Sequence, residues 1–213
     1  MLLFAGMSVM SDFARYGVAT VHEASGRTGI VDADLLQIVP GSRVAGRART
    51  VRCGQGDNLM VHAALSEVEA GEVLVLTMPE PAPVALVGEL IAIQALHRKV
   101  AGILVDGAVR DAEELARLGL PIWARWIRAT GATKDVVGGI NVPVEVGGML
   151  IRPGDIVVMD ADGAVVVPAE REAEVLRASA AREKNENEAR EKYRSGLLTY
   201  DLHGLRSKVE GRD

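Results

Sequence analysis

The chain has 213 residues, of which 48% are apolar and 25% charged, and its formal net charge is −5 at pH 7. This length favours one domain over two, and the apolar content is enough for a sizeable core, which excludes global disorder. Acids and bases are intermixed, and only 3% of the residues are aromatic. The composition therefore argues against a nucleic-acid-binding protein, which needs a positive face and usually stacking side chains.

The cysteine content and the apolar segments bear on the cellular setting. Cys53 is the only cysteine, so neither an internal disulfide nor a thiolate metal cluster can form, and a reducing, cytoplasmic setting is expected. The apolar start MLLFAGMSVM is too short to span a bilayer and has no basic region before it, so residues 1–10 are expected to form a frayed tail. No later segment is long and apolar enough to suggest a membrane partner.

Apolar periodicity and turn residues predict an alternation of helices and strands. Helices are expected over residues 9–16, 18–24, 57–71, 88–99 and 111–118, and strands over residues 42–53, 73–78, 100–105 and 121–126. The order strand, helix, strand between residues 73 and 105 predicts a right-handed parallel βαβ unit that is covered on both faces.

The last third of the chain differs from the rest in its sequence pattern. Residues 139–168 are β segments separated by glycine-containing turns, and residues 169–194 form one long, highly charged helix that is exposed or lies against a partner subunit. There is no internal repeat and no linker. We therefore expect a single domain over residues 1–213, with residues 169–213 as a helical extension that can reach a neighbouring subunit.

The stretch GILVDGAVRDAEEL (residues 102–115) places Arg110 and Asp111 where a buried strand ends. Asp111 and Glu114 have the form of a capping box, which an inert protein would also contain. In open α/β sheets, however, ligands bind outside the carboxyl ends of strands, and a second strand leads through a loop to Gly88, where a helix start offers free N–H groups. This edge predicts a site for a small carboxylate substrate, with Asp111 as a ligand for a divalent cation and Arg110 binding a substrate oxygen.

Three blocks of the sequence resemble the RraA-like family, which includes the class II pyruvate aldolases that act on 4-hydroxy-4-methyl-2-oxoglutarate. The blocks are GDNLMVHAAL, GELIAIQALHRKVAGILVDGAVRD and GINVPVEVGGMLIRPGDIVVMDADGAVVVP, and the resemblance runs from about Val18 to the C-terminal helix. It implies an α/β fold, an α/β/β/α swivelling-type (phosphohistidine-like) sandwich. It also implies a homo-oligomer, a trimer or a pair of trimers, with the active site between subunits.

The resemblance also implies roles for individual residues. Asp111 would ligate the divalent metal, Mg²⁺ or Mn²⁺, and the substrate would be bound by Gly88, Glu89, Leu90, Ile91 and Arg110. The aldolases have an aspartate where this chain has Glu89, which keeps the charge but reaches one methylene further. The regulatory branch of the family often lacks an acid at that place and in the dipeptide DG before the Arg–Asp pair, so Glu89 and Asp106 favour an enzyme.

Three further residues are candidates for catalysis, each with a simpler alternative. Glu23 lies in a loop-forming stretch and is otherwise a surface acid; His62 lies one helical turn after Asn58 and is otherwise a packing histidine. Glu186 is otherwise part of a solvated helix face, but it could complete a neighbouring subunit's site if the C-terminal helix crosses to it. The segment from residue 125 to 135 could line the pocket, with Arg125 or Arg128 taking a second carboxylate.

Together these features predict metal-dependent retro-aldol cleavage of 4-hydroxy-4-methyl-2-oxoglutarate-type 2-oxo acids to pyruvate, with oxaloacetate decarboxylation through the same enolate. No lysine lies in an apolar strand that would depress its pKa, so a lysine imine is not expected. The first alternative is a non-catalytic RraA-type regulator that binds an RNA-processing enzyme. The second is a decarboxylase or hydrolase of a related acid at the same site.

Overall fold

The computed structural model describes the backbone of residues 2–211 and the side chains of residues 9–211. Its helices are α1 (Leu2–Ala24), α2 (Leu59–Glu67), α3 (Glu89–His97), α4 (Ala112–Leu118), α5 (Glu172–Arg194), α6 (Thr199–Leu202) and α7 (Leu205–Glu210), with a 3-10 turn at Ala169–Arg171. Its strands are β1 (Leu36–Gln37), β2 (Val44–Arg52), β3 (Val73–Thr77), β4 (Ala85–Val87), β5 (Gly102–Val109), β6 (Ile122–Ile127), β7 (Gly139–Ile140), β8 (Val144–Val146), β9 (Met149–Ile151), β10 (Ile156–Asp160) and β11 (Gly163–Val167).

A mixed sheet connects most of these strands in the order β1-β6-β5-β3-β2-β10-β11, with β4 added beside β5 and β7 beside β2. The pairs β2–β3, β3–β5, β4–β5 and β5–β6 are parallel, whereas β10 pairs antiparallel with β2 and β11. The predicted parallel βαβ unit is therefore confirmed, with α3 as part of its crossover. Because β3, β4 and β5 run in the same direction, their carboxyl ends lie at one edge of the sheet.

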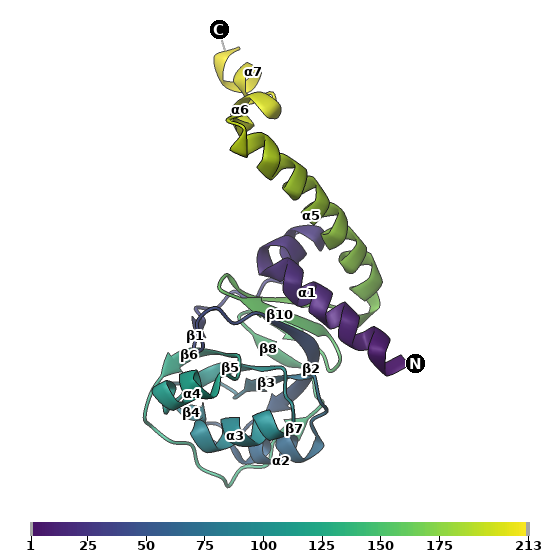
Figure 1. Ribbon diagram of the computed structural model, residues 1–213. Coiled ribbons are helices and arrows are strands. Elements are labelled where there is room, and N and C mark those ends of the chain that lie inside the picture. Colours follow the sequence, from purple (N-terminus) through teal and green to yellow (C-terminus); the bar gives the residue numbers. More distant parts are fainter. Residues whose placement is uncertain (1, 212–213) are drawn as a thin grey trace.

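Three apolar cores separate four layers, which confirms the α/β/β/α arrangement (Figure 1). One core lies between the strands and α2, α3 and α4; it includes Leu74, Leu76 and Ile103. A second fills the space between the strand layers around Val75, Leu104 and Trp123. The third packs α1 and the start of α5 against β10 and β11.

The first helix differs from expectation at its start and agrees with it in its middle. α1 begins at Leu2, so the frayed tail expected for residues 1–10 is not what the structure shows for residues 2–10. The predicted break at Gly17 is confirmed, since its φ of 78° and ψ of 174° interrupt the helix. Only glycine suits this position, because a Cβ there would lie 2.5 Å from Asp160 Oδ2, which accepts a hydrogen bond from Val18 N.

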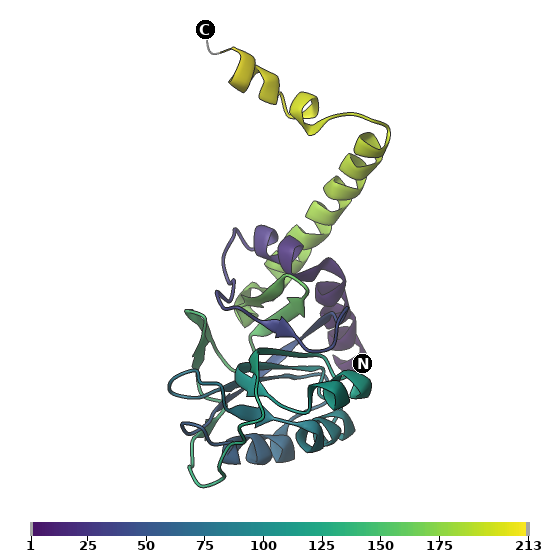
Figure 2. The same cartoon turned by 90° about the vertical axis from the view of Figure 1, so that its left-hand side faces the viewer.

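The predicted C-terminal helix is also confirmed. The first part of α5 packs on α1, and the helix then extends away from the layered core and carries α6 and α7 at its far end (Figures 1 and 2). Its mostly charged sequence leaves only Val175 and Ser179 buried. Among the helices that the structure describes, none is long and apolar enough to cross a membrane.

Candidate active site

The Arg110 side chain lies beside the N-terminus of α3. The backbone N–H of Arg110, the first residue after β5, donates to Val87 O at the end of β4 at 3.0 Å, which brings the Arg–Asp pair next to Gly88. A Cβ on Gly88 would lie 2.6 Å from Asp111 Oδ2 and 3.1 Å from Arg110 Nε, and one on Gly131 would lie 2.9 Å from Arg110 Nη1. Two glycines thus leave the space that the guanidinium occupies.

Asp111 does not form the predicted capping box with Glu114. It precedes α4 with a left-handed backbone (φ 57°, ψ 43°) and makes no side-chain hydrogen bond to that helix. Its Oδ2 instead accepts from Glu89 N at the start of α3, at 3.0 Å, and lies 3.6 Å from Arg110 Nε. A non-glycine residue in this conformation costs on the order of 1 kcal/mol or more, and such strained residues cluster at functional sites.

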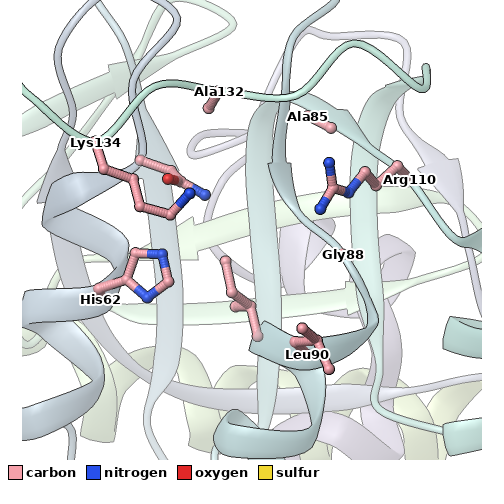
Figure 3. A pocket seen from close by; sticks show the side chains of 9 residues that line it. His62, Ala85, Gly88, Leu90, Arg110, Ala132 and Lys134 are labelled. Atoms are coloured by element: carbon pink, nitrogen blue, oxygen red, sulfur yellow. The ribbon is translucent and has the colours of Figure 1, made fainter.

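A pocket of about 130 Å³ opens between α2, α3 and the loop that follows β6 (Figure 3). Its lining contains most of the predicted substrate-binding residues and His62, together with residues that were not predicted. The lining residues are Asn58, His62, Ala85, Gly88, Leu90, Ile91, Arg110, Ala132 and Lys134. Arg110 and Lys134 approach this pocket from opposite sides, and Leu90 lies below them in the view of Figure 3. The pocket is therefore built to receive an anion.

α2 and the residue before it contribute two polar side chains with unused hydrogen-bonding atoms. Asn58 is only 7% exposed, and its Nδ2 donates to Leu86 O at 3.1 Å. Within the described part of the chain, Asn58 Oδ1 and His62 Nε2 are buried without a hydrogen-bond partner. Burial and then the charge of Lys134 lower the pKa of His62 from its ordinary value, so its imidazole is neutral near pH 7 and can donate or accept a hydrogen bond. Unsatisfied buried groups of this kind point to a ligand.

The loop after β6 is fixed over the pocket by Asp57, whose side chain is fully buried. Asp57 Oδ2 accepts from Thr133 Oγ1, Asp135 N and Val136 N at 2.7, 2.6 and 3.2 Å, and Oδ1 accepts from Leu59 N at 2.8 Å. Burial raises the pKa of Asp57, but these four hydrogen bonds outweigh it and lower the pKa to about 2. Asp57 therefore stays ionised and holds the loop against the start of α2.

Two of the predicted catalytic acids lie elsewhere. Glu23, near the end of α1, and Glu186, on α5, both form ion pairs with Arg182, at 3.8 and 2.9 Å. The pair Arg27–Glu23 adds to this cluster and is the first cause of the lowered pKa of Glu23. In Figure 1, α1 and α5 lie on one side of the strands and α3 lies on the other. A single chain thus does not bring Glu23 and Glu186 into the Arg110 pocket.

The arginines suggested for a second carboxylate do not line the pocket either. Arg125 forms an ion pair with the buried Asp106 on the neighbouring strand, and Arg128 is exposed and donates to Ile127 O at 2.8 Å. Asp106 is accordingly committed to Arg125 and is not a pocket residue. The suggested segment does reach the pocket, but through Ala132 and Lys134.

A divalent cation would find one suitable carboxylate here. No group of three or more histidine, cysteine or acidic side chains within the described residues is arranged to hold a metal. Asp111, whose side chain is 40% exposed, can offer an oxygen to a hydrated ion, and the partly exposed Glu89 is its neighbour across the Glu89 N–Asp111 bond. Mg²⁺ is commonly bound by one or two carboxylates, several waters and substrate oxygens, so this donor set fits a hydrated Mg²⁺.

Comparison with known proteins identifies the family of the chain. The sequence model of the RraA-like family, described as Aldolase/RraA, matches residues 17–166. A Halalkalibacterium halodurans protein with the provisional name 4-hydroxy-4-methyl-2-oxoglutarate aldolase is 39% identical over 150 residues, which cover 70% of this chain and 71% of the relative.

Solved structures are also similar. Streptomyces coelicolor RraAS2, described as an unusual member of the RNase ES inhibitor RraA protein family, has a TM-score of 0.76 and 32% identity and covers 86% of this chain and 96% of its own. An uncharacterized protein from Pseudomonas syringae has a TM-score of 0.80 and 27% identity and covers 90% of this chain and 94% of its own.

Proposed function

Because the chain belongs to the RraA-like family, we propose that it is a divalent-metal-dependent carbon–carbon lyase that cleaves 4-hydroxy-4-methyl-2-oxoglutarate-type 2-oxo acids to pyruvate. The observation that carries the proposal is the pocket in which Arg110 lies beside Gly88 at the start of α3, with Asp111 behind it. Oxaloacetate decarboxylation is proposed as a related activity, because loss of CO₂ gives the same pyruvate enolate.

The residues of this pocket supply charge, orientation and a path for a proton. Arg110 and the N–H groups at the start of α3, apart from Glu89 N, which donates to Asp111, bind the carboxylate and the 2-oxo oxygen of the pyruvyl half. A water held by Glu89 takes the proton of the 4-hydroxyl group, the C3–C4 bond breaks, and its electron pair forms the pyruvate enolate. Protonation of C3 gives pyruvate, and 4-hydroxy-4-methyl-2-oxoglutarate releases its other half as a second pyruvate.

A Mg²⁺ or Mn²⁺ ion bound at Asp111 would supply Lewis-acid charge to the 2-oxo oxygen. Arg110 places its guanidinium near the same oxygen, where negative charge develops as the enolate forms. Neutral His62 provides a hydrogen-bonding group on the opposite wall, from α2. The proposed site therefore combines cationic stabilisation with neutral polar contacts.

The direct test is pyruvate release by the purified protein supplied with Mg²⁺ and either 4-hydroxy-4-methyl-2-oxoglutarate or oxaloacetate. We expect pyruvate from both, and two pyruvates per molecule of the first substrate, with the activity lost in EDTA and restored by Mg²⁺. A blank without protein is needed, because oxaloacetate loses CO₂ spontaneously. No pyruvate from either substrate with folded, metal-supplied protein would contradict the proposal.

The second candidate function is a non-catalytic RraA-type regulator, which the similarity to Streptomyces coelicolor RraAS2 supports. Such a protein would bind an RNA-processing enzyme by its surface and would not require the Arg110 pocket. Affinity capture with wild type and Arg110→Ala separates the two candidates: a regulator would retain its partner after this change and would release no pyruvate at any stage.

Gly88→Ala tests whether the position of the Arg–Asp pair matters. Gly88 has φ −138°, which alanine adopts without strain, but its Cβ would lie within 3.1 Å of Arg110 and Asp111 atoms. Displacing a reacting group by about 1 Å can cost on the order of 100-fold, so we expect at least a tenfold loss of kcat/KM with little change in Tm. Kinetics and thermal denaturation measure both; unchanged kinetics would contradict the assigned geometry.

We further propose that the protein is a homo-oligomer, a trimer or a pair of trimers, in which a neighbouring chain brings Glu23 and Glu186 to the pocket. Both acids are held near Arg182, on the opposite side of the strands from α3, and α5 extends away from the core (Figure 1). Sedimentation of the active protein as a monomer would contradict this assembly.

A further inference from the structure

The pocket contains a second cation, Lys134, that the proposed mechanism does not use. In Figure 3 the Lys134 side chain points into the pocket from the side opposite Arg110. Arg110 lies 3.6 Å from the Asp111 carboxylate, whereas Lys134 forms no ion pair with any residue that the structure describes. The end of the pocket away from the Arg–Asp pair thus carries an unneutralised positive charge.

The backbone that carries Lys134 is anchored on both sides although the side chain is exposed. Thr133 O accepts from Asn58 N at 2.9 Å, and Thr133 Oγ1 and Asp135 N both donate to the buried Asp57 carboxylate. Since the residues before and after Lys134 are bonded to Asn58 and Asp57, the two residues before α2, the Lys134 backbone is held at the wall of the pocket. Such preorganisation reduces the cost of binding an anion there.

The wall beside this cation also has a buried acceptor without a donor. Asn58 lines the pocket and is only 7% exposed. The hydrogen bond from its Nδ2 to Leu86 O fixes the orientation of the amide, and Oδ1 has no hydrogen-bond partner. A buried acceptor of this kind is costly unless a ligand supplies a donor. A hydroxyl group on the ligand would satisfy it.

From these contacts, and resting on the proposed function, we infer that Lys134 is a specificity-determining residue that binds the second carboxylate of the substrate. Arg110 and the start of α3 bind the pyruvyl carboxylate, Lys134 binds the carboxylate at the far end, and Asn58 Oδ1 accepts from a hydroxyl between them. Lys134 thereby selects dicarboxylic substrates such as 4-hydroxy-4-methyl-2-oxoglutarate over 4-hydroxy-2-oxo acids with a single carboxylate.

Binding of two inert ligands tests this without catalysis. 2-Oxoglutarate has both carboxylates but no 4-hydroxyl, so it cannot undergo the retro-aldol reaction; pyruvate has only the first carboxylate. By calorimetry with Mg²⁺, wild type should bind 2-oxoglutarate more tightly than pyruvate, and Lys134→Met should lower this affinity ratio by about 10- to 100-fold, as expected for one charge-assisted hydrogen bond. The matched control is Arg128→Met, which removes a nearby exposed charge outside the pocket and should leave the ratio unchanged.

Steady-state kinetics provide a second test of the role of Lys134. Lys134→Met should reduce kcat/KM for 4-hydroxy-4-methyl-2-oxoglutarate, mainly through KM, far more than for 4-hydroxy-2-oxopentanoate, which lacks the distal carboxylate. Equal losses for both substrates, or an unchanged affinity ratio, would overturn the assignment of Lys134 while leaving the lyase intact. If wild type neither binds either ligand nor releases pyruvate, the proposed function fails and this inference fails with it.

Discussion

Arg110→Ala is expected to lower kcat/KM for pyruvate formation by about 10²- to 10³-fold, the usual loss when one preorganised donor to a developing negative charge is removed. The guanidinium lines the pocket beside the start of α3, and no other arginine does so among the residues described. Its loss should act on chemistry rather than on folding, because the Arg110 side chain is 49% exposed. The measurement is steady-state pyruvate release with both substrates.

Arg128→Ala is the matched control for this change. It removes the same charge from an exposed arginine whose only described side-chain bond is to its neighbour's carbonyl, Ile127 O. Activity of Arg128→Ala should remain near that of wild type. If Arg110→Ala retained activity comparable to this control, the pocket would not be the site of pyruvate formation.

Asp57→Asn is expected to destabilise the protein by about 2–3 kcal/mol, since it replaces a buried carboxylate that accepts four hydrogen bonds with an amide that must point donors at donors. For a chain of this size this corresponds to a fall in Tm of about 5–10 °C. Activity should fall as well, because the loop that carries Lys134 loses its anchor. Thermal denaturation and pyruvate release measure the two effects.

The pH dependence of stability gives a separate check on Asp57. Its pKa is about 2 in the folded chain, below the ordinary value of about 3.9 in an unfolded one. The unfolded state therefore binds the proton first, so the stability from Asp57 is fully present above about pH 5 and is lost as the pH falls toward 2. In Asp57→Asn, Tm should therefore fall less with decreasing pH than in wild type. Asp162→Asn, which changes an exposed turn residue, should lose Tm with acid as wild type does. Equal acid sensitivity of wild type and Asp57→Asn would contradict the role given to Asp57.

The sequence predicted the part of the site that depends on strand direction. Once the βαβ unit between residues 73 and 105 is recognised, the carboxyl ends of its strands must meet at one edge of the sheet. The final placement of Gly88 next to Arg110 comes from β4, a short strand that was not predicted and that pairs with β5. The capping box was wrong for a related reason. The pattern DAEE describes only the local helix, whereas the Asp111 carboxylate is attracted to Glu89 N, which is distant in sequence but adjacent across the sheet edge.

The segment 125–135 was expected at the pocket, but Lys134 and Asn58 were not identified as binding residues, because their placement depends on a loop that returns to the residues before α2. Thr133 pairs with Asp57 through contacts between residues 76 apart in sequence, and no local periodicity reports such a pairing. Arg125 was proposed for the pocket because its strand register was unknown. In the structure, Val105 of β5 pairs with Ala124 of β6, so the next residues along the two strands, Asp106 and Arg125, form an ion pair with each other.

The central claim is that the Arg110 pocket stabilises the enolate of pyruvate, and exchange of the pyruvate methyl protons in D₂O tests it most directly because the distal half of the substrate plays no part. With Mg²⁺, wild-type protein should deplete the methyl signal of pyruvate in the proton NMR spectrum far faster than the protein-free blank, and Arg110→Ala should not. Exchange that is equal in wild type and blank, with pyruvate bound and the protein folded, would contradict the lyase proposal.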